Sequence, residues 1–234
     1  MIPIWLTSVT SWFAEKFGGK IVAFGLDKIR TKLQSVFASR NILILGDSQT
    51  GKSSLILYLT TGKPYQIENG QISAPEKTSG YAVVDKKVTV NDNQLVVKMD
   101  LAGEQDMRSL WKMAIEKVRP VGIIYMLNGR LEKDELENEI QEIFDDVLCH
   151  YEGNQGAGLE AIHLFVNFVD QWGINNVEIR NKLRKISQSF DKRLNSKPSL
   201  LYLRVDVSAT QFSPHKDSWI EADRALFSFG SDLL

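Results

Sequence analysis

A phosphate-binding loop is indicated by Gly46-Asp47-Ser48-Gln49-Thr50-Gly51-Lys52-Ser53, which fits the Walker A pattern Gly-x-x-x-x-Gly-Lys-Ser/Thr. The apolar run 41–45 before it is typical of a buried strand, and residues 53–60 after it are typical of the start of a helix. Glycines let the backbone wrap closely around a phosphate chain, while successive N–H groups and the helix N-terminus point at the anion. This strand, loop and helix therefore predict that residues 46–54 bind the phosphates of a nucleotide.

Two side chains of the motif would add to the backbone contacts. Lys52 is expected to meet the β and γ phosphates, and the Ser53 hydroxyl is expected to ligate Mg²⁺. Ser54 follows in the first helical turn and is counted with the nucleotide-binding residues. The sequence thus predicts a nucleotide and Mg²⁺ as bound ligands.

The composition is that of an ordinary globular protein, with 43% hydrophobic residues and a net charge of −1 over 234 residues. A charge so close to zero argues against a protein that binds nucleic acid through bulk positive charge. The charge is nevertheless uneven, because residues 1–40 hold six basic and two acidic side chains. We therefore divide the chain into an N-terminal segment, residues 1–39, and a nucleotide-binding domain, residues 40–234.

The N-terminal segment has apolar stripes at helical spacing over residues 1–17 and 22–37, separated by Gly18-Gly19. Two amphipathic helices are expected here. The uncharged run of 14 residues at the start is too short to cross a bilayer core of about 30 Å. The stripes could pack on the chain's own domain or on a partner, or lie on a membrane surface, and the sequence leaves these alternatives open.

The cellular compartment is indicated by the single cysteine, Cys149, which excludes an internal disulfide and favours a reducing environment. A secretory signal is not expected, because a positively charged region is missing before the first apolar run. We expect a cytoplasmic protein, with contact at the periphery of a membrane through residues 1–37 as an alternative.

Strands and helices alternate after the phosphate loop. Residues 61–80 are rich in Gly, Pro, Asn and Ser and are expected to form a long exposed loop, followed by a hairpin of strands 81–90 and 94–99. Strands are then expected at 121–126, 161–166 and 200–205, and helices at 108–118, 131–151, 178–194 and 217–229. This alternation predicts an α/β sheet covered on both faces, with ligand loops at the carboxyl ends of the strands.

Three short motifs follow predicted strands at this edge of the sheet. They are Asp100-Leu101-Ala102-Gly103, Asn167-Phe168-Val169-Asp170 and Ser208-Ala209-Thr210. An acid such as Asp100, at the end of a strand that follows a phosphate loop, can hold Mg²⁺ through water. The motifs extend the expected site from the phosphates toward the rest of a nucleotide.

Together with Lys77-Thr78-Ser79-Gly80, these motifs resemble those of the small GTPases of the Ras-like superfamily, nearest to the ADP-ribosylation-factor-like branch, over about residues 41–229. The resemblance implies a mixed six-stranded sheet with helices on both faces, and GTP or GDP with Mg²⁺ as ligands. It also implies that the metal is held by Ser53, Thr78 and Asp100. Thr78 in switch I and Gly103 in switch II would contact the γ-phosphate.

The base-binding residues are implied by the same resemblance. Asn167 and Asp170 match the guanine-specificity motif, whose aspartate accepts hydrogen bonds from N1 and the exocyclic amine of the base. The last guanine loop, in which a backbone N–H meets O6, looks like Ser208-Ala209-Thr210. These residues imply a preference for guanine.

Two departures from the family bear on the mechanism. Phe168 stands where the family commonly has lysine, and its ring could cover the purine without supplying the charge. The glutamine that orients the attacking water is replaced by Glu104, with Gln105 one place later. A carboxylate is repelled by the γ-phosphate in a site that water screens poorly, so we expect slow hydrolysis. The catalytic candidates are Lys52, Thr78, Glu104 and Gln105.

The resemblance favours a GTPase that acts as a switch, in which the switch loops and the N-terminal helices control binding to a partner or a membrane. The alternative is a GTP-bound scaffold that does not hydrolyse its nucleotide, supported by Ser48, Phe168 and Glu104. A P-loop kinase of small metabolites is disfavoured, because Asn167, Asp170 and the motif at 208–210 have no evident use there.

Overall fold

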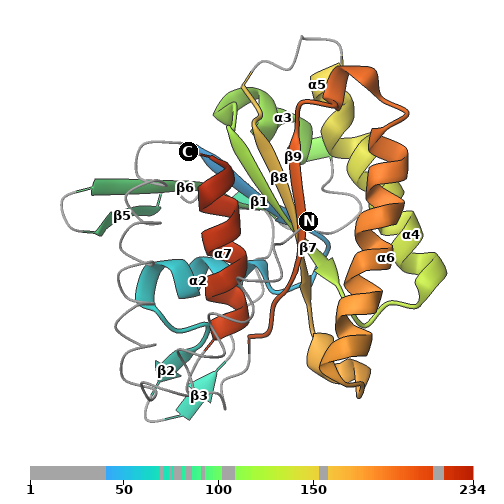
Figure 1. Ribbon diagram of the computed structural model, residues 1–234. Helices are drawn as coiled ribbons and strands as arrows, with labels where there is room; N and C mark the ends of the chain where they lie inside the picture. The colour runs from blue at the N-terminus through green and yellow to red at the C-terminus, as the bar shows by residue number, and fades with distance from the viewer. Residues whose placement is uncertain are drawn as a thin grey trace.

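The computed structural model describes residues 41–68, 71–73, 75, 81–82, 86–90, 93–101, 109–152, 158–212 and 219–233 (Figure 1). The two helices expected within residues 1–39 lie outside these ranges, as do Thr78 and residues 102–108. The described chain forms one main sheet with helices on both of its faces, as the alternation of apolar patterns predicted (Figure 1).

Within the described residues, the main sheet has seven strands. Four strands pair in parallel, in the order β1 (Ile42–Gly46), β7 (Gly122–Asn128), β8 (Ala161–Asn167) and β9 (Arg204–Ala209). On the other side of β1 lies β6 (Asn93–Leu101), also parallel, with a register shift between Ile42 and Ile44. Two short strands, β4 (Tyr81–Ala82) and β5 (Lys86–Val90), pair with β6 in the antiparallel sense. The mixed sheet was predicted correctly, but its count of six strands was wrong.

The additional strand arises because residues 81–90, expected as one strand, form β4 and β5 on different parts of β6. The hairpin between β5 and β6 is confirmed, with Val90 opposite Asn93. Residues 61–80, expected as an exposed loop, contain the short antiparallel pair β2 (Gln66–Glu68) and β3 (Gln71–Ser73). These two strands are connected by Asn69-Gly70, the dipeptide that favours a two-residue hairpin turn.

The three central strands are buried on both faces, which explains why their sequences are continuous apolar runs rather than alternating ones. Strands β7 and β8 stay in register over seven residues, from Gly122 opposite Ala161 to Asn128 opposite Asn167. Their carboxyl ends therefore finish level with each other, next to the end of β1 at Gly46.

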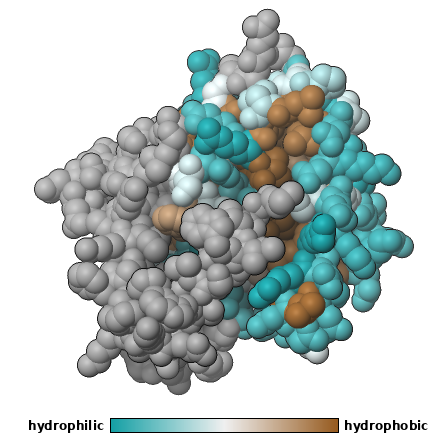
Figure 2. All heavy atoms as spheres, in the orientation of Figure 1, coloured by the Kyte–Doolittle hydropathy of each residue, from teal (hydrophilic) through white to brown (hydrophobic). Residues whose placement is uncertain are grey.

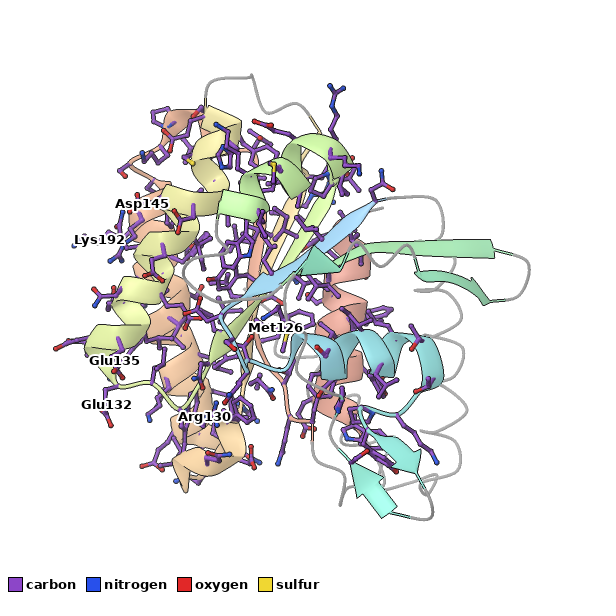
Figure 3. The ribbon with its side chains drawn as sticks, turned by 180° about the vertical axis from the view of Figure 1, so that it is seen from behind. Met126, Arg130, Glu132, Glu135, Asp145 and Lys192 are labelled. Atoms are coloured by element: carbon purple, nitrogen blue, oxygen red, sulfur yellow. The ribbon has the colours of Figure 1, made fainter. Side chains whose placement is uncertain are left out.

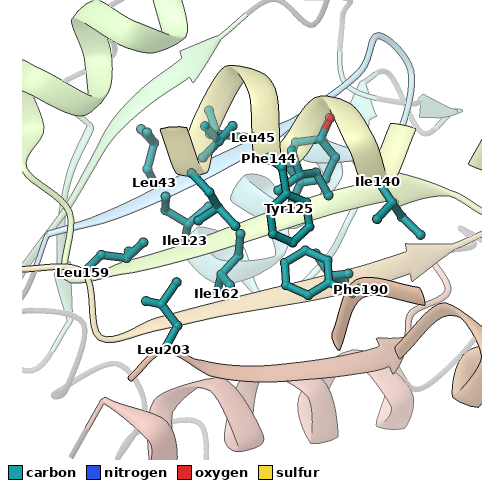
Figure 4. Packing of buried hydrophobic residues seen from close by; sticks show 14 of the residues in the cluster. Leu43, Leu45, Ile123, Tyr125, Ile140, Phe144, Leu159, Ile162, Phe190 and Leu203 are labelled. Carbon is teal, nitrogen blue, oxygen red and sulfur yellow. The ribbon is translucent and has the colours of Figure 1, made fainter. Parts of the chain in front are cut away.

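One face of the sheet is covered by α3 (Ser109–Val118), α4 (Lys133–Glu142), the π-helical turn η2 (Ile143–Leu148), α5 (Cys149–Glu152) and α6 (Asn176–Leu194). Figure 4 shows how buried side chains from these helices and from the strands pack together; those labelled include Leu43, Ile123, Tyr125, Phe144, Ile162 and Phe190. The rings of Phe144 and Phe190 lie 4.7 Å apart. Each large side chain buried here contributes about 1.5–3 kcal/mol.

The segment 131–151, expected as one helix, is divided by η2. The π-helical turn is wider than an α-helical one. It buries two pairs of neighbouring residues, Ile143 with Phe144 and Val147 with Leu148. These side chains lie in the same core cluster as Ile140 of α4, so the segment keeps one buried face although the helix is interrupted.

The opposite face is covered by α2 (Lys52–Thr61) and α7 (Ile220–Asp232), which lie side by side on the sheet (Figure 1). Their contact includes Tyr58, whose hydroxyl donates to the Asp223 carboxylate at 2.5 Å. The Tyr58 ring also packs against Phe212 and, edge-on, against Trp219. The helix that follows the phosphate loop is thus held by the last helix of the fold.

Strand β9 is the edge strand next to β8 in the described sheet. It starts four residues later than expected, because Pro198–Leu200 form the 3₁₀ turn η4 and Leu200 is buried there. Leu201 and Tyr202, between η4 and β9, are 54% and 47% exposed. In the view of Figure 2, apolar residues gather in the middle of the visible surface, beside the hydrophilic surface of α6.

Among the described residues, none of the helices is both long and apolar enough to span a bilayer.

Candidate functional site

The phosphate-loop motif lies between β1 and α2, as predicted. Gly46 and Gly51 have φ angles of 135° and 101°, which favour glycine. A Cβ atom at Gly46 would lie 2.4 Å from the carbonyl oxygen of Met126 in β7. The loop therefore runs so close to the neighbouring strand that a side chain at Gly46 would displace it.

Lys52, at the first position of α2, is 7% exposed. Its Nζ donates to the carbonyl oxygen of Asp47 at 2.6 Å, and the Thr50 hydroxyl donates to the same oxygen at 2.9 Å. The amine is thus held over its own loop, next to the backbone N–H groups at the N-terminus of α2. A buried cation beside a helix N-terminus is a favourable place for a phosphate.

Ser53 and Ser54 follow Lys52 in the first turn of α2, where both are partly exposed. Asp100, the other described candidate for Mg²⁺, lies near the end of β6 opposite Ile44 of β1. The sheet thus brings the backbone of Asp100 next to the strand that leads into the phosphate loop. The remaining candidates, Thr78, Gly103, Glu104 and Gln105, lie outside the described residues.

Asn167 connects the phosphate loop with the loop that follows β8. It is the last residue of β8 and is 1% exposed, and its Nδ2 donates to the Thr50 carbonyl oxygen at 3.0 Å. A Cβ atom at Gly51 would lie 2.4 Å from this Nδ2, so the contact requires glycine at that position. The Asn167 Oδ1 is buried and has no hydrogen-bond partner among the described residues.

Phe168 and Asp170 follow Asn167 in the loop after β8. Phe168 has a φ angle of 63°, which is uncommon for a bulky side chain, and it precedes the 3₁₀ turn η3 (Val169–Trp172). The Gln171 N–H donates to the Phe168 carbonyl oxygen at 3.0 Å. Asp170 is exposed, so its carboxylate is accessible to a ligand at this end of the sheet.

The third motif, Ser208-Ala209-Thr210, was expected in a turn, but Ser208 and Ala209 are the last residues of β9. They lie beside β8, opposite Phe165 and Val166, and the Thr210 N–H donates to the Val166 carbonyl oxygen at 2.8 Å. The buried Thr210 hydroxyl has no partner among the described residues. The motif thus lies beside the end of β8. Its first two residues are inside β9 because that strand both starts and ends four residues later than expected.

Two residues were missed by the sequence analysis, Asn128 and Arg130, which lie at and just beyond the end of β7. The Asn128 Oδ1 accepts hydrogen bonds from Arg130 Nε at 3.0 Å and from Arg130 N at 3.2 Å. The Arg130 guanidinium carbon lies 4.2 Å from the centroid of the Phe168 ring. A polar side chain at the end of a central parallel strand was the available signal, since ligands bind at that edge.

The described geometry fits a nucleotide. The glycines leave room for close backbone approach, and Lys52 offers a cation. Asn167 and Thr210 each hold a buried polar atom that lacks a partner within the part of the chain that the structure describes. Buried polar atoms are normally hydrogen-bonded, so a bound ligand with complementary groups would satisfy them.

Comparison with solved structures shows which fold this is. The signal recognition particle receptor SRb-GTP/SRX complex from Chaetomium thermophilum matches with a TM-score of 0.52 and 15% identity, over 82% of this chain and 97% of that chain. A GTP-binding protein from the archaeon Sulfolobus solfataricus, in complex with GDP, matches with a TM-score of 0.50 and 14% identity. That match covers 99% of this chain but 63% of the archaeal chain, which is less than two thirds of its length.

At these identities the comparisons establish the fold, which is that of P-loop GTP-binding proteins. No protein-family model matches this chain, and no curated protein matches its sequence.

Proposed function

We propose that this chain is a Mg²⁺-dependent GTP-binding switch protein that hydrolyses GTP slowly. The observation that carries the proposal is the buried hydrogen bond from Asn167 Nδ2 to the Thr50 carbonyl oxygen, at 3.0 Å. It joins the loop suited to phosphates with the motif suited to guanine, so one nucleotide can occupy both. The fold shared with GTP-binding proteins supports the same assignment.

At the phosphate end, the backbone N–H groups of residues 47–53 would bind the β and γ phosphates. The Lys52 amine would exchange its contact with the Asp47 carbonyl for phosphate oxygens, because a hydrogen bond to an anion is stronger than one to a neutral carbonyl. Ser53, Thr78 and Asp100 would hold Mg²⁺, which neutralises charge on the phosphates during transfer.

At the base end, the exposed Asp170 carboxylate would accept hydrogen bonds from N1–H and the exocyclic amine of guanine. Adenine offers no donor at N1, so this carboxylate selects against ATP. A backbone N–H in the motif at 208–210 would donate to O6. Phe168 would cover one face of the purine.

The switch would consist of Thr78 and Gly103, whose contacts with the γ-phosphate are lost on hydrolysis, which changes the affinity for a partner. Glu104 would slow the reaction through repulsion of the γ-phosphate, with Gln105 as the other candidate to orient water. Without an activator, GTPases of this fold turn over on the order of 10⁻⁴ to 10⁻² per second. We expect a rate at or below the lower end of this range.

The test is a time course with purified protein, Mg²⁺ and equimolar GTP and ATP, in which bound nucleotides and products are separated by chromatography. Selective binding of GTP with accumulation of GDP is expected. Lys52→Ala should abolish both, while Lys112→Ala, which removes an exposed lysine of α3, should change neither. Preferential binding of ATP would contradict the guanine assignment of Asn167 and Asp170.

Glu104→Gln separates the switch from the scaffold. In single-turnover experiments this variant should hydrolyse GTP faster than the wild-type protein, because a neutral amide can orient water without repelling the γ-phosphate. GTP that remains bound and intact in both proteins would instead favour the scaffold.

A further inference from the structure

Arg130 and Phe168 form an unusual pair at the base end of the site. The guanidinium carbon lies 4.2 Å from the ring centroid, well within the roughly 6 Å at which a cation over an aromatic face is attracted. The two residues come from the loops after β7 and β8, and these two strands end level with each other. Figure 3 shows Arg130 at this end of the sheet, next to the chain that begins α6.

The arginine is held in place from its own strand. The Asn128 carboxamide oxygen accepts from Arg130 Nε at 3.0 Å and from the Arg130 backbone N–H at 3.2 Å. One edge of the guanidinium is therefore fixed, which orients its plane. A side chain fixed in this way loses less rotational freedom when it stacks on a ring.

The two loops are also fixed to each other through Gly129. Its N–H donates to the Asn167 carbonyl oxygen at 3.0 Å, and its carbonyl oxygen accepts from the Trp172 indole N–H. Asn167 in turn contacts the phosphate loop through Thr50. The position of Arg130 relative to Phe168 is thus set by the same contacts that assemble the proposed nucleotide site.

Phe168 itself is held in a left-handed backbone conformation, with φ of 63°. For a bulky residue this conformation is strained, because its Cβ atom comes too close to the following carbonyl oxygen. Such strain is commonly kept where it serves a function. Here it lies between the two residues of the guanine-specificity motif, Asn167 and Asp170.

We infer that Arg130 and Phe168 together form one wall of the base site, and that Arg130 is a positioning residue for a guanine nucleotide. The inference rests on the proposed function and deepens it. Phe168 covers the purine, while Arg130 fixes the ring and provides the positive charge that lysine provides at this place in the resembled family. The cation is therefore supplied by the loop after β7 instead of by the motif itself.

The test measures release of fluorescently labelled GDP from the full-length protein in the presence of Mg²⁺. Arg130→Ala removes the cation from the aromatic face and should weaken GDP binding. We expect a roughly three- to thirtyfold faster release of GDP than from the wild-type protein. Arg130→Lys keeps the charge and should restore part of the loss. Lys182→Ala is the matched control, because it removes the cation that lies 4.6 Å from the Trp172 ring.

A second experiment, in a protein that carries Phe168→Lys, tests whether Arg130 acts through the Phe168 ring. In a Phe168→Lys protein the lysine supplies its own stem and charge, so adding Arg130→Ala should change the release rate less than twofold. A merely structural role of Arg130 predicts the same acceleration in both backgrounds, and that result would overturn the inference. It would also be overturned if Arg130→Ala alone released GDP at the wild-type rate.

Thermal unfolding distinguishes failure of the inference from failure of the proposed function. Without nucleotide, Arg130→Ala should melt within a few degrees of Lys182→Ala, while the rise in melting temperature on adding GDP should be smaller than in the control. If the wild-type protein shows neither GDP binding nor a GDP-induced rise, the proposed function and this inference both fail. Normal GDP binding with an unaffected Arg130→Ala protein rejects the inference alone.

Discussion

Gly129 directly follows β7 and lies against the end of β8. A Cβ atom there would lie 2.3 Å from the Asn167 carbonyl oxygen and 3.2 Å from Val166 Cγ1. The first contact is with backbone, which cannot rotate away as a flexible side chain could. The separation of the two loops, and with it the position of Asn167 against Thr50, therefore depends on the absence of a side chain at this residue.

We predict that Gly129→Ala lowers the free energy of unfolding by about 1–3 kcal/mol, the usual cost of forcing atoms into a well-packed region. It should also accelerate GDP release, because Asn167 must move. Urea denaturation and release of labelled GDP measure the two effects.

Gly158→Ala is the control for this prediction. Gly158 has a φ angle of 100°, but a Cβ atom there would meet nothing within 4 Å. The control should therefore show backbone strain of about 1 kcal/mol and unchanged GDP release. Equal release rates in Gly129→Ala and wild type would show that the close contact does not position Asn167.

Residues with a motif of their own could be predicted from the sequence. The phosphate loop, Asn167 and Asp170 belong to patterns with fixed spacing. The phosphate loop follows β1 and Asn167 ends β8, while Asp170 lies three residues later in η3. Arg130 belongs to no such pattern. Its role depends on the register between β7 and β8 and on the backbone angle of Phe168, neither of which the local sequence specifies.

The elements of the fold were predicted to different degrees. Continuous apolar runs marked β1, β7 and β8 well, because strands buried on both faces leave a simple signal. The start of β9 was misplaced, since the apolar residues before it bury Leu200 in a 3₁₀ turn instead of in the sheet. Apolar character alone does not distinguish these two ways of burying a side chain.

A contact between β8 and α7 places a titratable side chain in the core. His163 is fully buried in β8, its Nε2 lies 2.8 Å from the Asp232 carboxylate, and its ring packs edge-on against Phe229. Its Nδ1 has no partner among the described residues. Burial lowers the pKa of His163 below the usual 6.5, and this outweighs the opposite effects of Asp232 and Asp206.

We therefore predict that the folded state loses stability as the pH falls through 6.5 toward the lower pKa of folded His163. Between the two values the unfolded chain binds more protons, so the free energy of unfolding rises with pH. The slope for one proton is at most about 1.4 kcal/mol per pH unit. Urea denaturation between pH 5 and 8 measures it.

Two variants test whether His163 causes this dependence of the unfolding free energy on pH. His163→Gln should flatten it, whereas His150→Gln, which changes a histidine of α5, should leave it as in the wild type. The assignment is wrong if the slopes of wild type and His163→Gln coincide.

At the scale of the whole molecule, the charge of the chain is divided unevenly, with an excess of basic residues in residues 1–40. We predict that deletion of residues 1–17 leaves GDP binding intact and reduces association with anionic vesicles, because the apolar stripe with Trp5 and Trp12 is removed. Sedimentation with vesicles measures association, and neutral vesicles serve as the control. Unchanged sedimentation of the deleted protein would exclude membrane contact through this segment.

The packing of α2 against α7 has a consequence for how the protein is made. The phosphate loop is translated well before Trp219 and Asp223, which contact Tyr58 of the helix that presents the loop. At 5–20 residues per second, about ten to thirty seconds separate the two events. During this time the nascent chain carries a complete phosphate motif on a helix that lacks its contacts with Trp219 and Asp223. We therefore expect stable nucleotide binding only after α7 has been translated.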